Sequence, residues 1–368
     1  MTGFSGGVDP TKLDANMRLA AETDTALVWK SPMEEPFRLT GFPWLGTDGV
    51  YRRLPVSPSH SLRPAVDTLA NCTAGGQIQF RTDSATVVLQ AELAGPANMY
   101  HMPSTGQCGF DCYIGSFGEQ AFVGTTRMKP TETKVEYPLF ELKGIPRKMR
   151  TVTIHFPLYQ GVKRVQIGLD AEAALEAPAP YTDDRRVIFY GTSITQGGCA
   201  SRPGMAFTNI LSRRFHREFI NLGFSGNGRG EPELAHLIAQ IERPALLALD
   251  YAANVSTEQY IATLPEFIRI YRSVHPDTPI LVVSKIPYAQ EPLNAAMRER
   301  RIIGRDFARQ LVDTLQADGD RNIAFQNGDE LLGEDPEECT VDGSHPNDLG
   351  FRRMADGFTP ILRKLLCP

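Results

Sequence analysis

Short apolar runs alternate with helical segments through the second half of the chain, and this alternation restricts the fold more than any other feature. Between the runs, apolar residues recur with a helical period, as at Phe207, Ile210, Leu211 and Phe215. Strands that alternate with helices favour a five-stranded, doubly wound parallel sheet, which we place in residues 186–368. The five runs are VIFY, FINLG, ALLAL, PILVVS and NIAFQ, at 187–190, 219–223, 245–249, 279–284 and 322–326.

The first half of the chain has a different pattern. Residues 85–93 and 150–156 are rich in β-branched side chains, and Gly and Pro interrupt the surrounding sequence at short intervals. This spacing predicts an all-β sandwich, jelly-roll-like, in residues 1–175. Residues 39–44 (LTGFPW) fit either an edge strand or a docking loop.

Alanine, proline and acidic residues dominate residues 171–185, which are therefore predicted to form an interdomain linker. A short linker of this composition is stiff. We therefore expect the β domain to pack against the second domain, with one of its loops near the functional site.

Charge and hydropathy argue against several classes of partner. The net charge is −5, and the most basic stretch, residues 297–309 (MRERRIIGRDFAR), mixes both signs at helical spacing. It is predicted to be a solvated helix face, so we expect no nucleic-acid binding. No segment reaches the ~20 apolar residues of a membrane helix, so no membrane partner is expected. The amino terminus lacks the pattern of a signal peptide, and a cytoplasmic location is the default expectation.

The cysteines give no sign of a disulfide framework or a metal site. Six cysteines in a long chain without a secretion signal favour free thiols. Cys108 and Cys112 lie near His101, but their C-x3-C spacing has no second pair, so we expect neither metal nor cofactor. The six are Cys72, Cys108, Cys112, Cys199, Cys339 and Cys367.

Two strand ends carry residues suited to nucleophilic catalysis. Ser193 directly follows the first strand, in YGTSITQGG, and a serine hydroxyl needs a nearby base to attack a carbonyl. Among the seven histidines, His345 follows the fifth strand, and Asp342 precedes it by three residues. The carboxylate can orient the imidazole and stabilise its protonated form. The alternatives are a turn serine and an aspartate that caps the last helix, but these leave the shared position at the strand ends unexplained.

The ends of the second and third predicted strands supply donors for a developing oxyanion. Gly226 lies in the GFSGNGRG loop after the second strand, where its N–H can be presented freely. Asn254 follows the third strand, in LDYAANV, and offers a side-chain amide, with Asn227 as the substitute. A flexible glycine loop and a helix cap before Ser256 are the plainer interpretations.

The segments GTSITQGG, NLGFSGNG, the Asn after the third strand, and DGSHP resemble, in order, the four blocks of the GDSL/SGNH hydrolases. Residues 46–55 (GTDGVYRRLP) resemble the all-β, GxDLY-type domain that precedes one branch of that superfamily. The resemblance covers residues 186–366 and implies a flavodoxin-like SGNH fold. It also implies Ser193, Asp342 and His345 as the triad, with the Ser193 N–H, Gly226 N–H and Asn254 amide as oxyanion donors. Thr192 stands where the family has Asp, and DYAAN replaces G-x-N-D.

These residues predict a serine esterase that forms an acyl-serine intermediate on short-chain esters, including acetylated sugars. The expected partner is a small-molecule or glycan ester. Two alternatives stay open: an acyltransferase that uses the same triad, and a glycan-binding protein with an inactive hydrolase fold.

Overall fold

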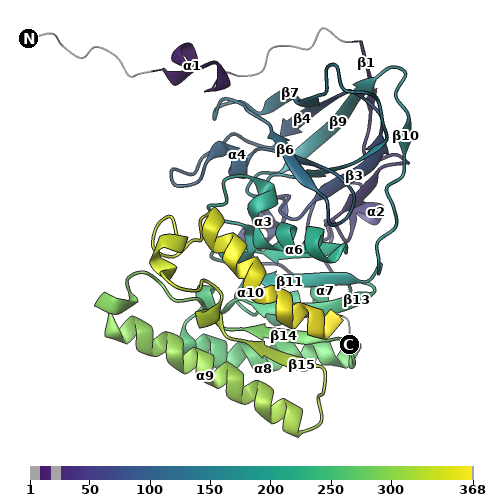
Figure 1. Cartoon of the computed structure of the whole chain (residues 1–368). Helices are drawn as coiled ribbons and strands as arrows, with labels where there is room; N and C mark the ends of the chain where they lie inside the picture. Colours follow the sequence, from purple (N-terminus) through teal and green to yellow (C-terminus); the bar gives the residue numbers. More distant parts are fainter. Residues whose placement is uncertain (1–8, 18–25, 367–368) are drawn as a thin grey trace, which may run out of the picture.

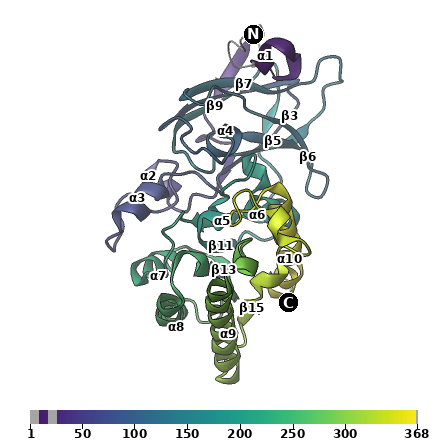
Figure 2. The ribbon, with the colours of Figure 1, turned by 90° about the vertical axis from the view of Figure 1, so that its left-hand side faces the viewer.

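The computed structural model describes residues 9–17 and 26–366; residues 1–8, 18–25 and 367–368, and with them Cys367, lie outside the described part. Figures 1 and 2 show a β-rich region at one end of the molecule and an α/β region at the other. The five described cysteines are free thiols.

Two antiparallel sheets form the β-rich region. Alternate residues of facing strands, such as Ile78 and Phe80 on one side and Val87 and Leu89 on the other, share one buried core. The predicted sandwich is therefore present. One sheet has the order β1 (Leu27–Lys30), β9 (Val162–Asp170), β4 (Thr86–Leu93), β7 (Lys134–Glu141). The other has the order β10 (Leu175–Glu176), β3 (Gln77–Thr82), β8 (Arg150–His155), β5 (Asp111–Ile114), β6 (Ala121–Thr125), with β2 (Arg38–Thr40) also paired to β3.

The linker prediction for residues 171–185 was too broad. Leu175 and Glu176 form β10 and pair with Thr82 and Arg81 of the sandwich, so the connection begins only after them. Of the two interpretations of residues 39–44, the edge strand holds for the start of the segment, because β2 includes Leu39 and Thr40.

The five predicted parallel strands are present in the α/β region, in the order β12 (Phe219–Gly223), β11 (Arg186–Gly191), β13 (Pro244–Asp250), β14 (Ile280–Val283), β15 (Ile323–Gln326). Alternation along β11 sends Val187 and Phe189 to one face and Ile188 and Tyr190 to the other. On the first face pack α6 (Phe207–Phe215) and α10 (Asp348–Leu366). On the second pack α7 (Pro232–Ile238), α8 (Thr257–Val274) and α9 (Ala295–Ala317).

Short helices connect these elements: α1 (Pro10–Leu13), α2 (Leu45–Asp48), α3 (Pro64–Ala70), α4 (Ser104–Gln107) and α5 (Ser193–Gln196). Single 3-10 turns cover η1 (Ala15–Met17), η2 (Pro203–Met205), η3 (Ala252–Asn254), η4 (Glu291–Leu293), η5 (Gly328–Glu330) and η6 (Pro336–Cys339). Among the helices of residues 9–17 and 26–366, none combines the length and apolarity needed to cross a bilayer.

The segment around α3 belongs in packing terms to the α/β region, although it lies within the first 175 residues. Leu54, Val66 and Ala70 are buried in the same core as Ile188 and Ile220 of the parallel sheet. Arg53, fully buried, donates hydrogen bonds to the carbonyls of Asn221, Gly223 and Leu69. Residues from the first half of the chain therefore complete a core of the α/β region.

This shared core predicts that residues 180–368 do not fold stably alone. The fragment lacks Leu54 and Val66, and burial of each such side chain contributes roughly 1.5–3 kcal/mol. It also leaves the carbonyls of Asn221 and Gly223 without Arg53. We expect aggregation, or circular dichroism without a cooperative thermal transition, whereas residues 26–368 should melt like the full chain. A soluble 180–368 fragment with a melting temperature close to that of the full chain would contradict this expectation.

Candidate active site

The turn that carries Ser193 is fixed by its neighbours. Thr192 caps α5: its hydroxyl accepts the Ile194 N–H at 3.2 Å, and the Thr195 hydroxyl accepts the Thr192 N–H at 3.2 Å. A Cβ at Gly191 would lie 2.1 Å from the Thr195 hydroxyl oxygen, so this close approach requires glycine. Ser193 is consequently the first residue of α5, at the carboxyl end of β11.

The structure brings Ser193, His345 and Asp342 together in one hydrogen-bonded relay. The Ser193 Oγ lies 2.9 Å from His345 Nε2, and His345 Nδ1 lies 2.7 Å from Asp342 Oδ2. Both distances are normal for hydrogen bonds. Asp342 and His345 come from the loop between β15 and α10, which meets the end of β11 at the carboxyl edge of the sheet.

Asp342 is held as a carboxylate. Its Oδ1 accepts the backbone N–H groups of Ser344 and His345 and the Ser344 hydroxyl. Burial alone would raise the pKa of Asp342, but these bonds and the His345 imidazole outweigh burial and lower the pKa below its ordinary value. An ionised Asp342 favours the His345 tautomer with hydrogen on Nδ1, which leaves Nε2 free to accept the Ser193 proton.

The glycine-rich loop after β12 lies beside this relay and is tied to α5. The Ser225 N–H donates to Gln196 Oε1 at 3.0 Å. Gly226 has φ +65°, and its N–H donates to no residue of the described chain. The Asn254 amide nitrogen donates to the carbonyls of Phe224 and Gly228, each at 3.1 Å, and thus closes this loop. The Asn227 amide nitrogen donates to the Ser225 carbonyl, and its oxygen accepts from Arg63.

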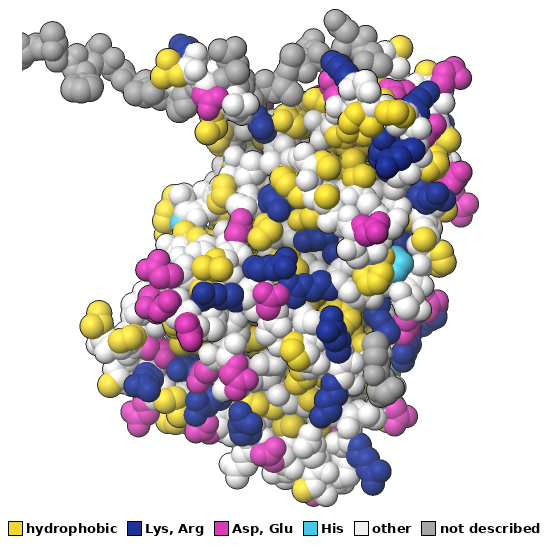
Figure 3. All heavy atoms as spheres, viewed as in Figure 1, with side chains coloured by type: hydrophobic (Ala, Val, Ile, Leu, Met, Phe, Trp, Pro, Cys, Tyr) yellow, Lys and Arg dark blue, Asp and Glu magenta, His cyan; other side chains and the backbone are white. Residues whose placement is uncertain are grey.

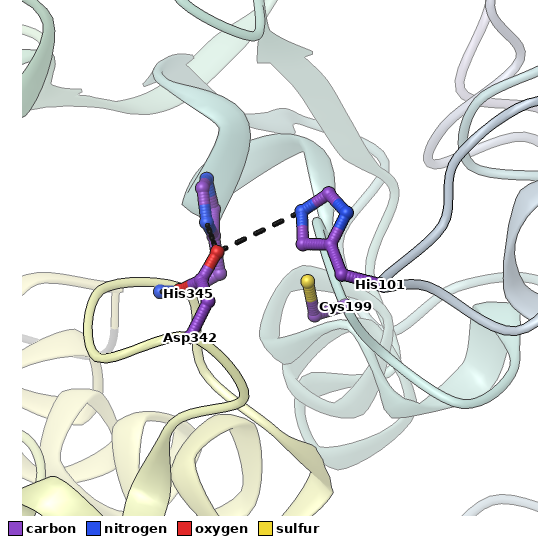
Figure 4. A group of neighbouring side chains, drawn as sticks. All are labelled: His101, Cys199, Asp342 and His345. Carbon is purple, nitrogen blue, oxygen red and sulfur yellow. Dashed lines mark hydrogen bonds and ion pairs between the residues drawn. The ribbon is translucent and has the colours of Figure 1, made fainter.

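The β sandwich contributes residues that reasoning from the sequence missed. His101 lies in the loop before α4, and its Nε2 is 3.7 Å from Asp342 Oδ2 (Figure 4). Tyr159, after β8, places its hydroxyl 3.3 Å from the Ser193 carbonyl. No acidic residue lies three positions from His101 in the sequence, so local spacing carried no signal for it. The contact does match the expectation that a loop of the β domain reaches the site.

Four side chains here offer atoms that metal ions bind: His101, Cys199, Asp342 and His345, all within 4.8 Å of one another (Figure 4). Burial, with Asp342 nearby, raises the pKa of the Cys199 thiol to about 12, which keeps it protonated and makes it a poor ligand. Asp342 and His345 are also engaged with each other. The arrangement therefore suits a hydrogen-bonded relay better than a metal centre.

Asp250, at the end of β13, lies behind the turn that carries Ser193. Its Oδ2 accepts the Thr195 hydroxyl at 2.8 Å, and the same hydroxyl accepts the Thr192 N–H. Burial raises the pKa of Asp250 to about 7, although the bond from Thr195 acts in the opposite direction. The carboxyl group thus supports the turn and can be protonated near neutral pH.

A sandwich of antiparallel sheets joined to a five-stranded parallel sheet, with Ser, His and Asp hydrogen-bonded at the strand ends, defines a class of two-domain α/β proteins. The GDSL-like lipase/acylhydrolase family matches residues 184–363, and the N-terminal domain of SGNH-hydrolase-type esterases matches residues 27–175. The chain belongs to the GDSL-like lipase/acylhydrolase family.

Solved structures agree with this assignment. A protein described as a GDSL-like lipase from Bacteroides ovatus is 30% identical, with a TM-score of 0.84, over 93% of this chain and 98% of that chain. A salicylyl-acyltransferase from a tetracycline biosynthetic pathway is 22% identical, with a TM-score of 0.75, over 92% and 97% of the two chains. A family two carbohydrate esterase from Cellvibrio japonicus is 14% identical, with a TM-score of 0.60, over 93% and 98%. None of the curated proteins matches the chain.

The two departures from the family pattern have structural counterparts. Thr192 caps α5 through its hydroxyl, a role for which Thr and Asp are both suited. The DYAAN segment ends β13 with Asp250 and forms η3, which brings Asn254 to the glycine loop.

The pKa of Asp250 predicts a pH-dependent stability. Between about pH 4 and 7 the folded chain holds a proton that the unfolded chain releases, so the free energy of unfolding falls as pH rises through this range. Asp250→Asn keeps an acceptor for Thr195 and does not titrate. We expect the melting temperature of the wild type to fall, relative to that of Asp250→Asn, between about pH 4 and 7.

Asp313→Asn is the matched control, since Asp313 is exposed on α9. Parallel curves of melting temperature against pH for the wild type and Asp250→Asn would show that Asp250 does not retain its proton.

Proposed function

We propose that this protein is a serine esterase with Ser193 as nucleophile, His345 as general base and Asp342 as the residue that orients His345. The observation that carries the proposal is the continuous relay Ser193 Oγ–His345 Nε2–Asp342, with distances of 2.9 and 2.7 Å. Ser193 follows β11, whereas Asp342 and His345 lie together in the loop between β15 and α10. The relay has the polarity that acyl transfer requires.

The steps follow from this geometry. His345 Nε2 takes the Ser193 proton while the Ser193 oxygen bonds to the ester carbonyl carbon, forming a tetrahedral oxyanion. The oxyanion collapses to an acyl-serine, and His345 returns the proton to the departing alcohol oxygen. Water then attacks the acyl-serine, again with His345 as base, which releases the acid and restores the Ser193 hydroxyl.

The oxyanion donors in this proposal are backbone groups. The Ser193 N–H, in the first turn of α5, and the Gly226 N–H donate to no other described residue. Asn254 was predicted to be a third donor, but its amide nitrogen already serves the carbonyls of Phe224 and Gly228. We infer that Asn254 acts by holding the loop that presents Gly226.

The proposed substrates are short-chain acyl esters, with acetylated sugars among them. The relay is accessible, because the His345 and Asp342 side chains are 28% and 31% exposed. Tyr100, next to His101 on the loop from the sandwich, is 99% exposed and stands free to meet an alcohol moiety. The carbohydrate esterase among the structural neighbours is in keeping with sugar esters.

An acyltransferase is the second candidate, because a salicylyl-acyltransferase shares the fold over 92% of this chain. The two candidates differ only in the acceptor that attacks the acyl-serine. Product analysis separates them when the reaction is run in water alone and with added alcohols or unacetylated sugars. A transferase is favoured if the new ester, and not the free acid, is the main product.

Replacement of the nucleophile tests the mechanism. Ser193→Ala should lower kcat on aryl acetates by roughly 10³-fold or more, because the relay acts as a unit. It should also abolish labelling by a fluorophosphonate probe, with an unchanged melting temperature. Ser116→Ala, in an exposed loop of the sandwich, should behave as wild type. More than about a tenth of wild-type activity in purified Ser193→Ala would exclude the serine mechanism.

Replacement of Asn254 distinguishes a loop anchor from a direct donor. If Asn254 anchors the loop, Asn254→Ala should lower kcat at least tenfold and also lower the melting temperature, because two carbonyls lose their donor. A direct donor predicts a loss of about 10²–10³ in kcat without a change in stability. Kinetics and thermal melts of the same preparation decide between the two roles.

A further inference from the structure

A hollow of about 740 Å³ lies away from Ser193, at the junction of the two regions. Strands β5 and β6 with their connecting loop form one wall, and η2, α6 and α10 form the other. Figure 3 shows basic side chains gathered on the face where these elements meet. Five arginines line it: Arg202, Arg213, Arg214, Arg352 and Arg363.

Two carboxylates lie close to these arginines. Arg202 pairs with the buried Asp111 at 2.6 Å, and Asp356 pairs with Arg214 and, at 3.8 Å, with Arg352. Within residues 9–17 and 26–366, no carboxylate pairs with Arg213 or Arg363. Five guanidinium groups and two carboxylates give the surroundings of the hollow three more positive than negative charges. The whole chain, in contrast, has a net charge of −5.

The arginines at the base of the hollow are fixed before any ligand arrives. Arg202 donates to the Tyr113 hydroxyl at 2.7 Å and lies 3.8 Å from the centre of the Phe122 ring. Arg213 donates to the Gly204 carbonyl and lies 4.0 Å from the centre of the Tyr113 ring. Guanidinium groups held in this way lose little conformational freedom when they bind an anion.

His155, which is fully buried, contacts Arg213 from behind the hollow and adds no charge of its own. Burial lowers the pKa of His155 despite the opposing effect of Asp111, so the ring is neutral and its Nε2 accepts from Arg213 at 3.2 Å. At the rim, Arg352 and Arg363 are exposed and free to turn toward a ligand. The planar guanidinium group can donate two parallel hydrogen bonds to the paired oxygens of a phosphate or carboxylate group.

We propose that this hollow is a second binding site, for a small polyanion that carries several phosphate or carboxylate groups. The rigid Arg202 and Arg213 would bind one anionic group at the base, and Arg352 and Arg363 would close on a second at the rim. The proposal is independent of the ester chemistry at Ser193.

Calorimetry on the full chain at 150 mM salt tests the proposal with two probes, sodium triphosphate and citrate, at matched ionic strength. We expect at least one probe to bind with one-to-one stoichiometry and to raise the melting temperature. The better probe shows whether phosphate or carboxylate groups are preferred. Arg363→Gln and Arg352→Gln, both at exposed positions, should each weaken binding about tenfold.

Arg300→Gln is the matched control, because Arg300 is exposed on α9 in the most basic stretch of the sequence. It removes the same charge elsewhere and should bind as the wild type does. Failure of both probes to bind, or equal weakening in Arg300→Gln, would overturn the proposal. The Arg213→Gln variant adds a test of the base: if it folds and binds as the wild type does, the base is not the anion site.

Discussion

The common level at which three parallel strands end is the constraint on which the rest of the site depends. Gly191 at the end of β11 stands opposite Gly223 of β12 and Asp250 of β13. The segments that follow these residues therefore start side by side, and they carry Ser193, Gly226 and Asn254. A side chain at Gly191 would collide with the Thr195 hydroxyl and the Asp250 carbonyl. The turn after β11 can therefore pack this closely against Thr195 and β13 only because Gly191 has no Cβ.

The sandwich is part of this arrangement and more than an appended module. Its loop after β8 accepts a hydrogen bond from Gln196 through the Leu158 carbonyl, and Gln196 in turn binds Ser225. A single side chain of α5 therefore links the sandwich, the turn that carries Ser193 and the glycine loop. His101 lies beside Asp342, and Arg53 donates to the Gly223 carbonyl at the end of β12. The first half of the chain therefore contacts the site on both sides. A displacement of the sandwich would break these contacts and change the surroundings of Ser193.

The order of strands and helices after residue 186 was predictable because each element shows its period locally, and Asp342 and His345 were visible because three residues separate them. The finer prediction of a doubly wound, flavodoxin-like sheet stays a prediction, although helices cover both faces. His101 and the arginine hollow were not predictable, because their residues come from distant segments that only the docked domains bring together. Residues 297–309 are easily recognised in the sequence because their basic side chains are close together. The arginines of the hollow are spread from 202 to 363 and form no such cluster in the sequence. Asn254 was found by its position, but its two carbonyl partners depend on how the glycine loop closes.

The arginine hollow and the relay are joined by the segment between α5 and α6. Cys199, with φ +74°, is one of few described non-glycine residues in the left-handed region, and it bends the chain beneath Asp342 and His345. Two residues later, Ser201 donates its N–H to Asp348 at the start of α10, the helix that follows the His345 loop. Arg202 then enters the hollow and pairs with Asp111 of the sandwich. One short stretch thus contacts the relay, the last helix and the domain junction in turn. If the hollow binds an anion as proposed, this stretch holds both a ligand residue of the hollow, Arg202, and the Cys199 turn beside the relay.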